Sequence, residues 1–264
     1  MAHELEVVAR KSGGASPHPP LLFVHGAAHG AWCWADHFLG FFSDRGFDAY
    51  ALSLRGHGGS GGRERLRWTS VADYVDDVAH VAAGLPQEPV VVGHSMGGMV
   101  AARYLSRRRP PAAALLAPAP PGGMPRQWAR LSADNPWLTV EMLLTLEAGK
   151  MFSTPARARK FLFSPELEEE DLRRHAVRLG RESIRAVLEL SWMRPDPTRF
   201  HRTPMLVLGA ARDYIIPPEE VLRTADAYGA EARILPDIAH DLMLDSGWPR
   251  AADALLAWLA ATLA

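Results

Sequence analysis

Residues 89–98 of the chain read Pro89-Val90-Val91-Val92-Gly93-His94-Ser95-Met96-Gly97-Gly98. The apolar run before Gly93 predicts a buried strand, and the residues after Gly98 predict a helix. A Gly-x-Ser-x-Gly sequence between a strand and a helix is typical of a strained turn that exposes the serine hydroxyl. Strand and helix pass close together at such a turn, so glycine is expected on both sides of it. We therefore predict that Ser95 is a nucleophile.

Short apolar runs recur along the chain and alternate with segments of helical periodicity. The runs that predict strands buried on both faces cover residues 21–24, 47–52, 90–92, 113–116, 205–208 and 232–235. Residues 4–9 predict an antiparallel edge strand, and amphipathic helices are expected over residues 71–82 and 251–263. This alternation predicts an α/β fold with a mainly parallel central sheet flanked by helices.

The alternation stops between residues 118 and 202, which contain several helical patterns and no clear strand. We expect residues 1–117 and 203–264 to form the core domain and residues 118–202 to form a helical lid inserted into it. Ligands of parallel sheets bind outside the carboxyl ends of the strands, where such an insertion would cover Ser95. Trp128, Trp137 and Trp192 are large apolar residues predicted to bound the substrate pocket, and packing of the lid onto the core domain is the alternative role for them.

Two further residues with catalytic side chains follow predicted strands. Asp213 lies in the loop after the run at 205–208, and His240 follows the run at 232–235. A serine nucleophile needs a base and a carboxylate that orients the base. The order Ser95, Asp213, His240, with each residue at the carboxyl end of a strand, predicts a Ser-His-Asp triad.

The oxyanion formed during acyl transfer needs backbone N–H donors. The sequence Val24-His25-Gly26-Ala27-Ala28 follows the first parallel strand directly, and its small residues allow the main chain to approach the reacting atom. We expect the N–H groups of Ala27 and Met96 to form the oxyanion hole. His25 is interpreted as a structural histidine that holds this loop.

These motifs together resemble the α/β-hydrolase superfamily over nearly the whole chain. Residues 24–34 are especially similar to the oxyanion loop of the branch that contains plant methyl-ester esterases and hydroxynitrile lyases, and residues 54–60 resemble another loop of the superfamily. Two positions depart from the pattern. Ala239 stands where glycine is common, and Asp241 stands where the lyases carry lysine. Because an acidic residue would repel cyanide, the second departure disfavours lyase chemistry.

Composition excludes several other classes. The chain has 264 residues and a net charge of −1, and this near-neutral charge argues against a nucleic-acid partner. It has one cysteine, Cys33, so an internal disulfide is excluded. The N-terminal residues do not resemble a signal peptide, and no apolar run reaches the length of a membrane span. We therefore expect a cytoplasmic protein without a membrane partner, and the sequence predicts no oligomeric state. His25 and His29 are four residues apart, but they lie in a predicted loop without an adjacent acidic residue, so no metal site is predicted.

The predicted function is hydrolysis of a small or medium, largely apolar carboxylic ester through an acyl-enzyme, without a cofactor. The same triad is also compatible with hydrolysis of a C–C bond in a diketone, with thioester hydrolysis and with acyl transfer. A small-molecule receptor that keeps the pocket and turns over little is the alternative from another class. An intact triad and oxyanion loop favour catalysis.

Overall fold

The computed structural model describes residues 4–192 and 203–264. Its centre is a seven-stranded sheet in the order β1-β3-β2-β4-β5-β6-β7. The β1–β3 pair is antiparallel, and the other five pairs are parallel. The strands are β1 (Val7–Arg10), β2 (Leu21–Val24), β3 (Ala49–Leu52), β4 (Val90–His94), β5 (Ala113–Leu116), β6 (Met205–Ala210) and β7 (Glu231–Leu235). The predicted mainly parallel sheet with an antiparallel edge strand is confirmed.

The register brings the carboxyl ends of the central strands to one edge of the sheet. Val24 of β2 lies opposite Gly93 of β4, and His94 lies opposite Leu116 of β5. Strands β2, β4 and β5 are fully buried, as their continuous apolar sequences predict. The loops that follow these strands therefore converge on one place.

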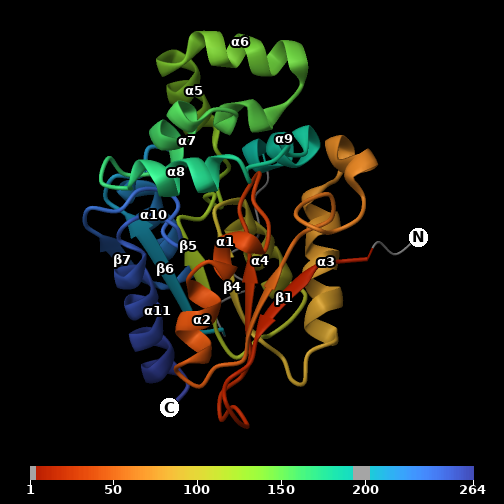
Figure 1. Ribbon diagram of the computed structural model, residues 1–264, viewed down its shortest axis with the longest axis vertical. Helices are drawn as coiled ribbons and strands as arrows, with labels where there is room; N and C mark the ends of the chain where they lie inside the picture. The colour runs from red at the N-terminus through yellow and green to blue at the C-terminus, as the bar shows by residue number, and fades with distance from the viewer. Residues whose placement is uncertain (1–3, 193–202) are drawn as a thin grey trace.

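Helices cover both faces of the sheet (Figure 1). Connections between parallel strands are right-handed. The chain moves from β2 to β3 in one direction along the sheet and from β3 to β4 and onward in the opposite direction, so α1 and α2 lie on one face and α3, α4 and α10 on the other. Helix α11 packs against α2. These helices are α1 (Trp32–Ala35), α2 (Phe38–Ser43), α3 (Val71–Ala83), α4 (Met96–Leu105), α10 (Pro218–Tyr228) and α11 (Trp248–Thr262), and a short 3₁₀ helix, η1 (Arg63–Trp68), precedes α3. None of the described helices is both long and apolar enough to cross a membrane.

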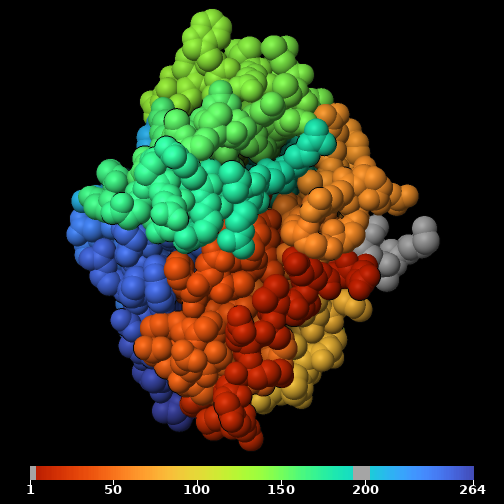
Figure 2. Space-filling view, viewed as in Figure 1, coloured from red at the N-terminus to blue at the C-terminus, as the bar shows by residue number. Residues whose placement is uncertain are grey.

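A helical insertion connects β5 to β6. Its elements are α5 (Pro125–Asp134), α6 (Pro136–Thr145), η2 (Ala148–Phe152), α7 (Pro155–Leu162), α8 (Glu169–Ala176) and α9 (Ile184–Trp192). They form a layer over one end of the core, with α5 and α6 outermost (Figures 1 and 2). The boundary at residues 118–202 stays a prediction, and its segment 193–202 lies outside the described residues.

Two backbone hydrogen bonds attach the insertion to loops at the carboxyl edge of the sheet. The Gly180 N–H donates to the Ala28 carbonyl at 2.7 Å, and the Asp241 N–H donates to the Leu162 carbonyl at 3.0 Å. Ala28 belongs to the loop after β2, and Asp241 belongs to the loop after β7. The insertion thus covers the edge at which the loops converge.

Candidate active site

Ser95 lies at the turn between β4 and α4 in a backbone conformation that side chains rarely adopt. Its φ is 52° and its ψ is −116°. A Cβ atom on Gly93 would lie 2.3 Å from the Gly97 carbonyl oxygen, and one on Gly97 would lie 2.4 Å from the His25 carbonyl oxygen. Glycine is needed at both positions because backbone passes so close to them. A strained residue held by such packing is a common feature of functional sites.

A chain of hydrogen bonds joins the three residues of the predicted triad. The Ser95 hydroxyl lies 3.0 Å from Nε2 of His240, and Nδ1 of His240 lies 2.7 Å from Oδ2 of Asp213. The other carboxylate oxygen of Asp213 accepts the N–H groups of Ile215 and Ile216 at 2.7 and 2.8 Å. These two bonds fix the carboxylate, which in turn orients the imidazole so that Nε2 faces Ser95.

Burial and charge act in opposite directions on the His240 imidazole. Its residue is 2% exposed, and burial alone would lower its pKa. The Asp213 carboxylate outweighs burial and raises the pKa of His240 above the ordinary value of 6.5. The carboxylate therefore favours the protonated form that the imidazole reaches when it accepts a proton.

The loop after β2 approaches the serine closely, as its small residues predict. A Cβ atom on Gly26 would lie 2.7 Å from Nδ1 of His94 and 3.1 Å from Cβ of Ser95. Within the described part of the chain, the N–H groups of Ala27 and Met96 donate no hydrogen bond to another protein group. Both residues line the same cavity as Ser95, so these two donors are available to a ligand there.

The peptide group between Ala27 and Ala28 is held from both sides. Nδ1 of His29 lies 2.8 Å from the Ala27 carbonyl oxygen, and the Ala28 N–H donates to Oε2 of Glu182 at 3.0 Å. Ala28 has a φ of 65°, a conformation that costs energy for a residue other than glycine. The insertion, through Glu182, therefore helps to set the position of the loop that contains the Ala27 donor.

Glu182 is a buried carboxylate that the sequence analysis did not identify. Besides Ala28, it accepts hydrogen bonds from Nε2 of His57 at 3.1 Å, the Tyr74 hydroxyl at 2.9 Å and the Ser183 N–H at 2.6 Å. Burial opposes ionisation of both members of the Glu182–His57 pair. Their mutual attraction outweighs it, so the pKa of Glu182 lies below its ordinary value and that of His57 lies above. Apart from the adjacent Ser183, these partners come from three distant parts of the chain, and no local motif marks them.

A second buried network lies behind His240. Oδ2 of Asp241 lies 2.9 Å from Nε2 of His29, so an acidic residue does accompany this histidine, contrary to the expectation from sequence. Asp241 is absent from the described residues that line the cavity, so its carboxylate does not face the space beside Ser95. His25 has the structural role expected of it, since its Nε2 accepts the Leu54 N–H at 3.0 Å.

Metal-ligating atoms of His94, His240 and Asp241 lie within 4.8 Å of one another. Both nitrogens of His240 already bond Ser95 and Asp213, and Nε2 of His94 lies 3.0 Å from the His240 carbonyl oxygen. Burial lowers the pKa of His94 to about 3, so its imidazole is neutral and Nε2 donates to that carbonyl. These hydrogen bonds hold the loop that carries His240, whereas Nδ1 of His94 and Oδ1 of Asp241 are buried without a hydrogen-bond partner among the described residues.

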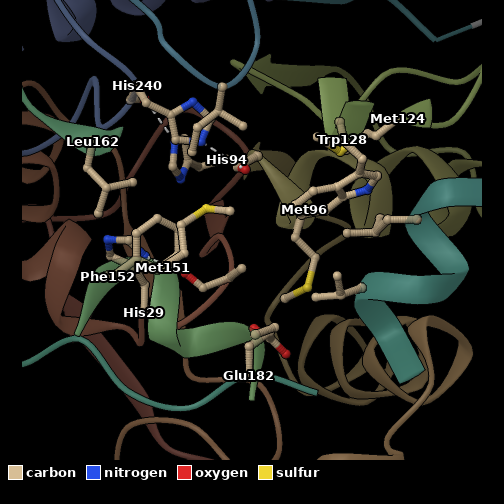
Figure 3. Close-up of a pocket in the computed structure, with 17 residues that line it drawn as sticks. His29, His94, Met96, Met124, Trp128, Met151, Phe152, Leu162, Glu182 and His240 are labelled. Carbon is tan, nitrogen blue, oxygen red and sulfur yellow. Dashed lines mark hydrogen bonds between the residues drawn. The ribbon is translucent and has the colours of Figure 1, made fainter. Parts of the chain in front are cut away.

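Ser95 opens into an apolar cavity of about 60 Å³ beneath the insertion. Figure 3 shows His240 and His94 on one side, Trp128 and Met124 on another, and Glu182 on the wall away from His240. Met151, Phe152 and Leu162 of the insertion complete much of the remaining wall. The arrangement places a strained serine hydroxyl, an imidazole hydrogen-bonded to it and two free N–H donors around one small apolar space.

The three predicted pocket tryptophans lie in different places. Trp128 of α5 lines the cavity beside Ser95. Trp137 of α6 and Trp192 of α9 do not line it, and their residues are 84% and 77% exposed. Trp128 is thus placed beside Ser95, whereas a role of all three tryptophans in substrate binding stays a prediction. Both α6 and α9 expose an apolar face, so large apolar residues of the insertion do not all point towards Ser95.

Comparisons with known proteins agree with this geometry. The model of the alpha/beta hydrolase family matches residues 21–256. A monoacylglycerol lipase of Mycolicibacterium smegmatis is 25% identical over 263 residues, 94% of this chain and 90% of that protein. The pFDCC methylesterase MES16 of Arabidopsis thaliana is 35% identical over 88 residues, 33% of each chain. The chain spans 24% to 33% of the length of the methylesterases that it matches.

Solved structures show the same fold. A putative non-heme bromoperoxidase of Mycobacterium tuberculosis superposes with a TM-score of 0.76 at 19% identity, over 99% of this chain and 97% of that one. Its likeness concerns the fold alone, whereas the family match covers most of the sequence, including Ser95, Asp213 and His240. The resemblance inferred from the sequence motifs is thereby confirmed, and the chain belongs to the alpha/beta hydrolase family.

Proposed function

We propose that the protein is a serine hydrolase that cleaves a largely apolar carboxylic ester through an acyl-enzyme intermediate. The observation that carries the proposal is the pair of hydrogen bonds that links Asp213 to His240 and His240 to Ser95. Ser95 has a strained backbone and faces an apolar cavity. A protein that only binds a ligand has no need of a strained nucleophile with an oriented base.

In the first half of the reaction, the Ser95 oxygen attacks the ester carbonyl carbon while Nε2 of His240 accepts the hydroxyl proton. The Asp213 carboxylate accepts a hydrogen bond from Nδ1–H of the imidazole and stabilises the imidazolium that forms. The carbonyl oxygen becomes negative and receives hydrogen bonds from the Ala27 and Met96 N–H groups. When the C–O bond to the alcohol breaks, His240 returns its proton to the leaving oxygen.

In the second half, water replaces the alcohol. His240 accepts a proton from water, and the resulting hydroxide attacks the acyl carbon bound to Ser95. The same two N–H groups stabilise the second tetrahedral intermediate. The acid then leaves and the proton returns to the Ser95 oxygen. Each step uses side chains and backbone groups of this chain, and no cofactor enters the scheme.

One observation favours an apolar substrate, and another favours an ester. The residues that enclose the cavity beyond Ser95 are mainly apolar, with Met124, Met151 and Phe152 among them, so the bound group is expected to be apolar. The relatives reported above are described as a monoacylglycerol lipase and a methylesterase, names that both denote ester hydrolysis.

The test is steady-state hydrolysis of p-nitrophenyl acetate and butyrate by purified protein, beside matched thioester and diketone substrates. We expect turnover of the esters, and a loss on the order of 10⁶ in kcat for Ser95→Ala. Ser106→Ala, which alters an exposed serine at the end of the same helix α4, is the control and should retain full activity. Faster turnover of a thioester or diketone would reassign the bond that is cleaved, and tight binding of esters without turnover would indicate a receptor.

A further inference from the structure

A second, larger apolar chamber lies within the helical insertion, outside the cavity at Ser95. Its volume is about 550 Å³, and its walls come from α5, α6, η2, α7 and α9. The described residues that line it include no charged side chain, and Ser132, Asn135, Thr139 and Ser191 are its polar members. Its volume falls in the range of about 300–1,000 Å³ typical of small-molecule sites, whereas the cavity at Ser95 is far below that range.

The chamber and the catalytic cavity share a wall. Trp128 of α5, Met151 of η2 and Val187 of α9 line both spaces. Trp128 and Val187 are half-buried, and the unbranched Met151 side chain can change its rotamer at small cost. A chain that extends from the Ser95 carbonyl position past these three residues would enter the chamber.

The far side of the chamber opens to solvent through an apolar rim. Four exposed apolar residues line the chamber at this rim. They are Leu143 of α6 (69% exposed), Leu146 directly after α6 (43%), and Leu188 and Trp192 of α9 (55% and 77%). The outer layer formed by α5 and α6 lies at the end of the molecule (Figure 2). Contiguous exposed apolar surface of this kind marks a site that binds an apolar partner. A polar ligand would gain nothing from it.

We propose that this chamber binds the hydrocarbon chain of a single-chain lipid ester whose carbonyl group lies at Ser95. The inference rests on the proposed function and specifies its substrate class. The cavity at Ser95 holds the ester group and the atoms next to it, and the chamber holds the remainder of the chain. Each methylene that leaves water for the chamber is expected to raise kcat/KM up to about fourfold, until the chamber is filled.

The test compares two substrate series below their critical micelle concentrations. One series varies the acyl chain of p-nitrophenyl esters from acetyl to dodecanoyl, and the other varies the alkyl chain of the alcohol in acetate esters. The chamber predicts a steep rise of kcat/KM with length in one of the series, which also identifies the side of the ester that enters it. A rise limited to a few carbons, with no further gain, is what the cavity at Ser95 alone would produce.

Two adjacent leucines of α6 provide a matched pair of variants. Leu143 lines the chamber, whereas Leu144 is 81% exposed and does not line it. In Leu143→Glu, a carboxylate in the chamber wall should lower the ratio of long-chain to acetyl kcat/KM by at least tenfold. Leu144→Glu should leave this ratio unchanged. Because both leucines are largely exposed, neither variant is expected to disturb folding.

Val187→Trp tests the passage between the two spaces. A larger side chain there should shift the preferred chain length toward shorter esters, with the folded state checked by thermal unfolding. If acetyl esters are hydrolysed but the long-to-short ratio is the same in the parent, Leu143→Glu and Val187→Trp, the chamber proposal is overturned while the proposed function stands. If esters of every length resist hydrolysis, the proposed function itself fails.

Discussion

Replacing Glu182 with alanine is expected to lower the free energy of unfolding by about 3–5 kcal/mol, because it removes one partner of a buried ion pair. The variant leaves the His57 imidazole, the Tyr74 hydroxyl and the Ala28 N–H without their acceptor in a buried site. For a protein of this size, each kcal/mol shifts the melting temperature by about 2–4 °C. The melting temperature should therefore fall by about 6–20 °C.

The assay is equilibrium unfolding in urea, followed by far-UV circular dichroism, together with calorimetry. Glu170→Ala removes an exposed carboxylate from the same insertion and is the control, with an expected change within about 0.5 kcal/mol. A loss for Glu182→Ala as small as that of the control would refute the reasoning, since the pair would then contribute nothing to the stability of the fold.

The Glu182–His57 pair also determines how the stability difference between wild type and Glu182→Ala depends on pH. The pKa of Glu182 is lowered in the folded state, so its contribution is present above the ordinary value of 4.5 and is lost as the pH falls through the folded pKa. The pKa of His57 is raised, so its contribution is complete below 6.5 and is lost as the pH rises through the folded pKa. The stability difference between wild type and Glu182→Ala should be largest between these two values.

The remaining predictions concern activity. His240 must be neutral to act as a base, and its pKa is raised. The acidic limb of kcat/KM against pH should therefore have a midpoint above 6.5, and a midpoint at or below 6.5 would contradict this prediction. Asp213→Asn should lower kcat by about 10⁴ and move that limb to lower pH, because the charge that raises the pKa of His240 is gone, and a small loss would indicate another carboxylate. Trp128→Ala should change the chain-length preference, whereas Trp137→Ala should not, as measured by kcat/KM across the ester series.

The features that sequence predicts well are those set by local signals. The glycines around Ser95 and the apolar strand before it are adjacent in the chain, and their geometry follows from sterics. The meeting of Asp213 and His240 could be predicted because each follows its own strand, and parallel strands bring their carboxyl ends to one edge. The strands at 21–24 and 113–116 begin and end where the apolar runs do.

The features that sequence missed depend on contacts between distant segments. Glu182 is 125 residues from His57 and 108 residues from Tyr74, so no spacing marks their association. The same holds for Asp241 and His29, which are 212 residues apart. Trp137 was misplaced for another reason. Apolar residues occupy most positions of α6, so their spacing does not distinguish the inner face of this helix from the outer one.

The most direct test of the central claim is to locate the residue that a serine-directed phosphonate modifies. The wild-type protein should lose ester hydrolysis in proportion to a single adduct, and peptide mass spectrometry should place that adduct on Ser95. Ser95→Ala should carry no adduct and should bind an uncleavable ester analogue as the wild type does, because the cavity walls are intact. Inactivation by an adduct on another residue, or near wild-type hydrolysis by Ser95→Ala, would contradict the account.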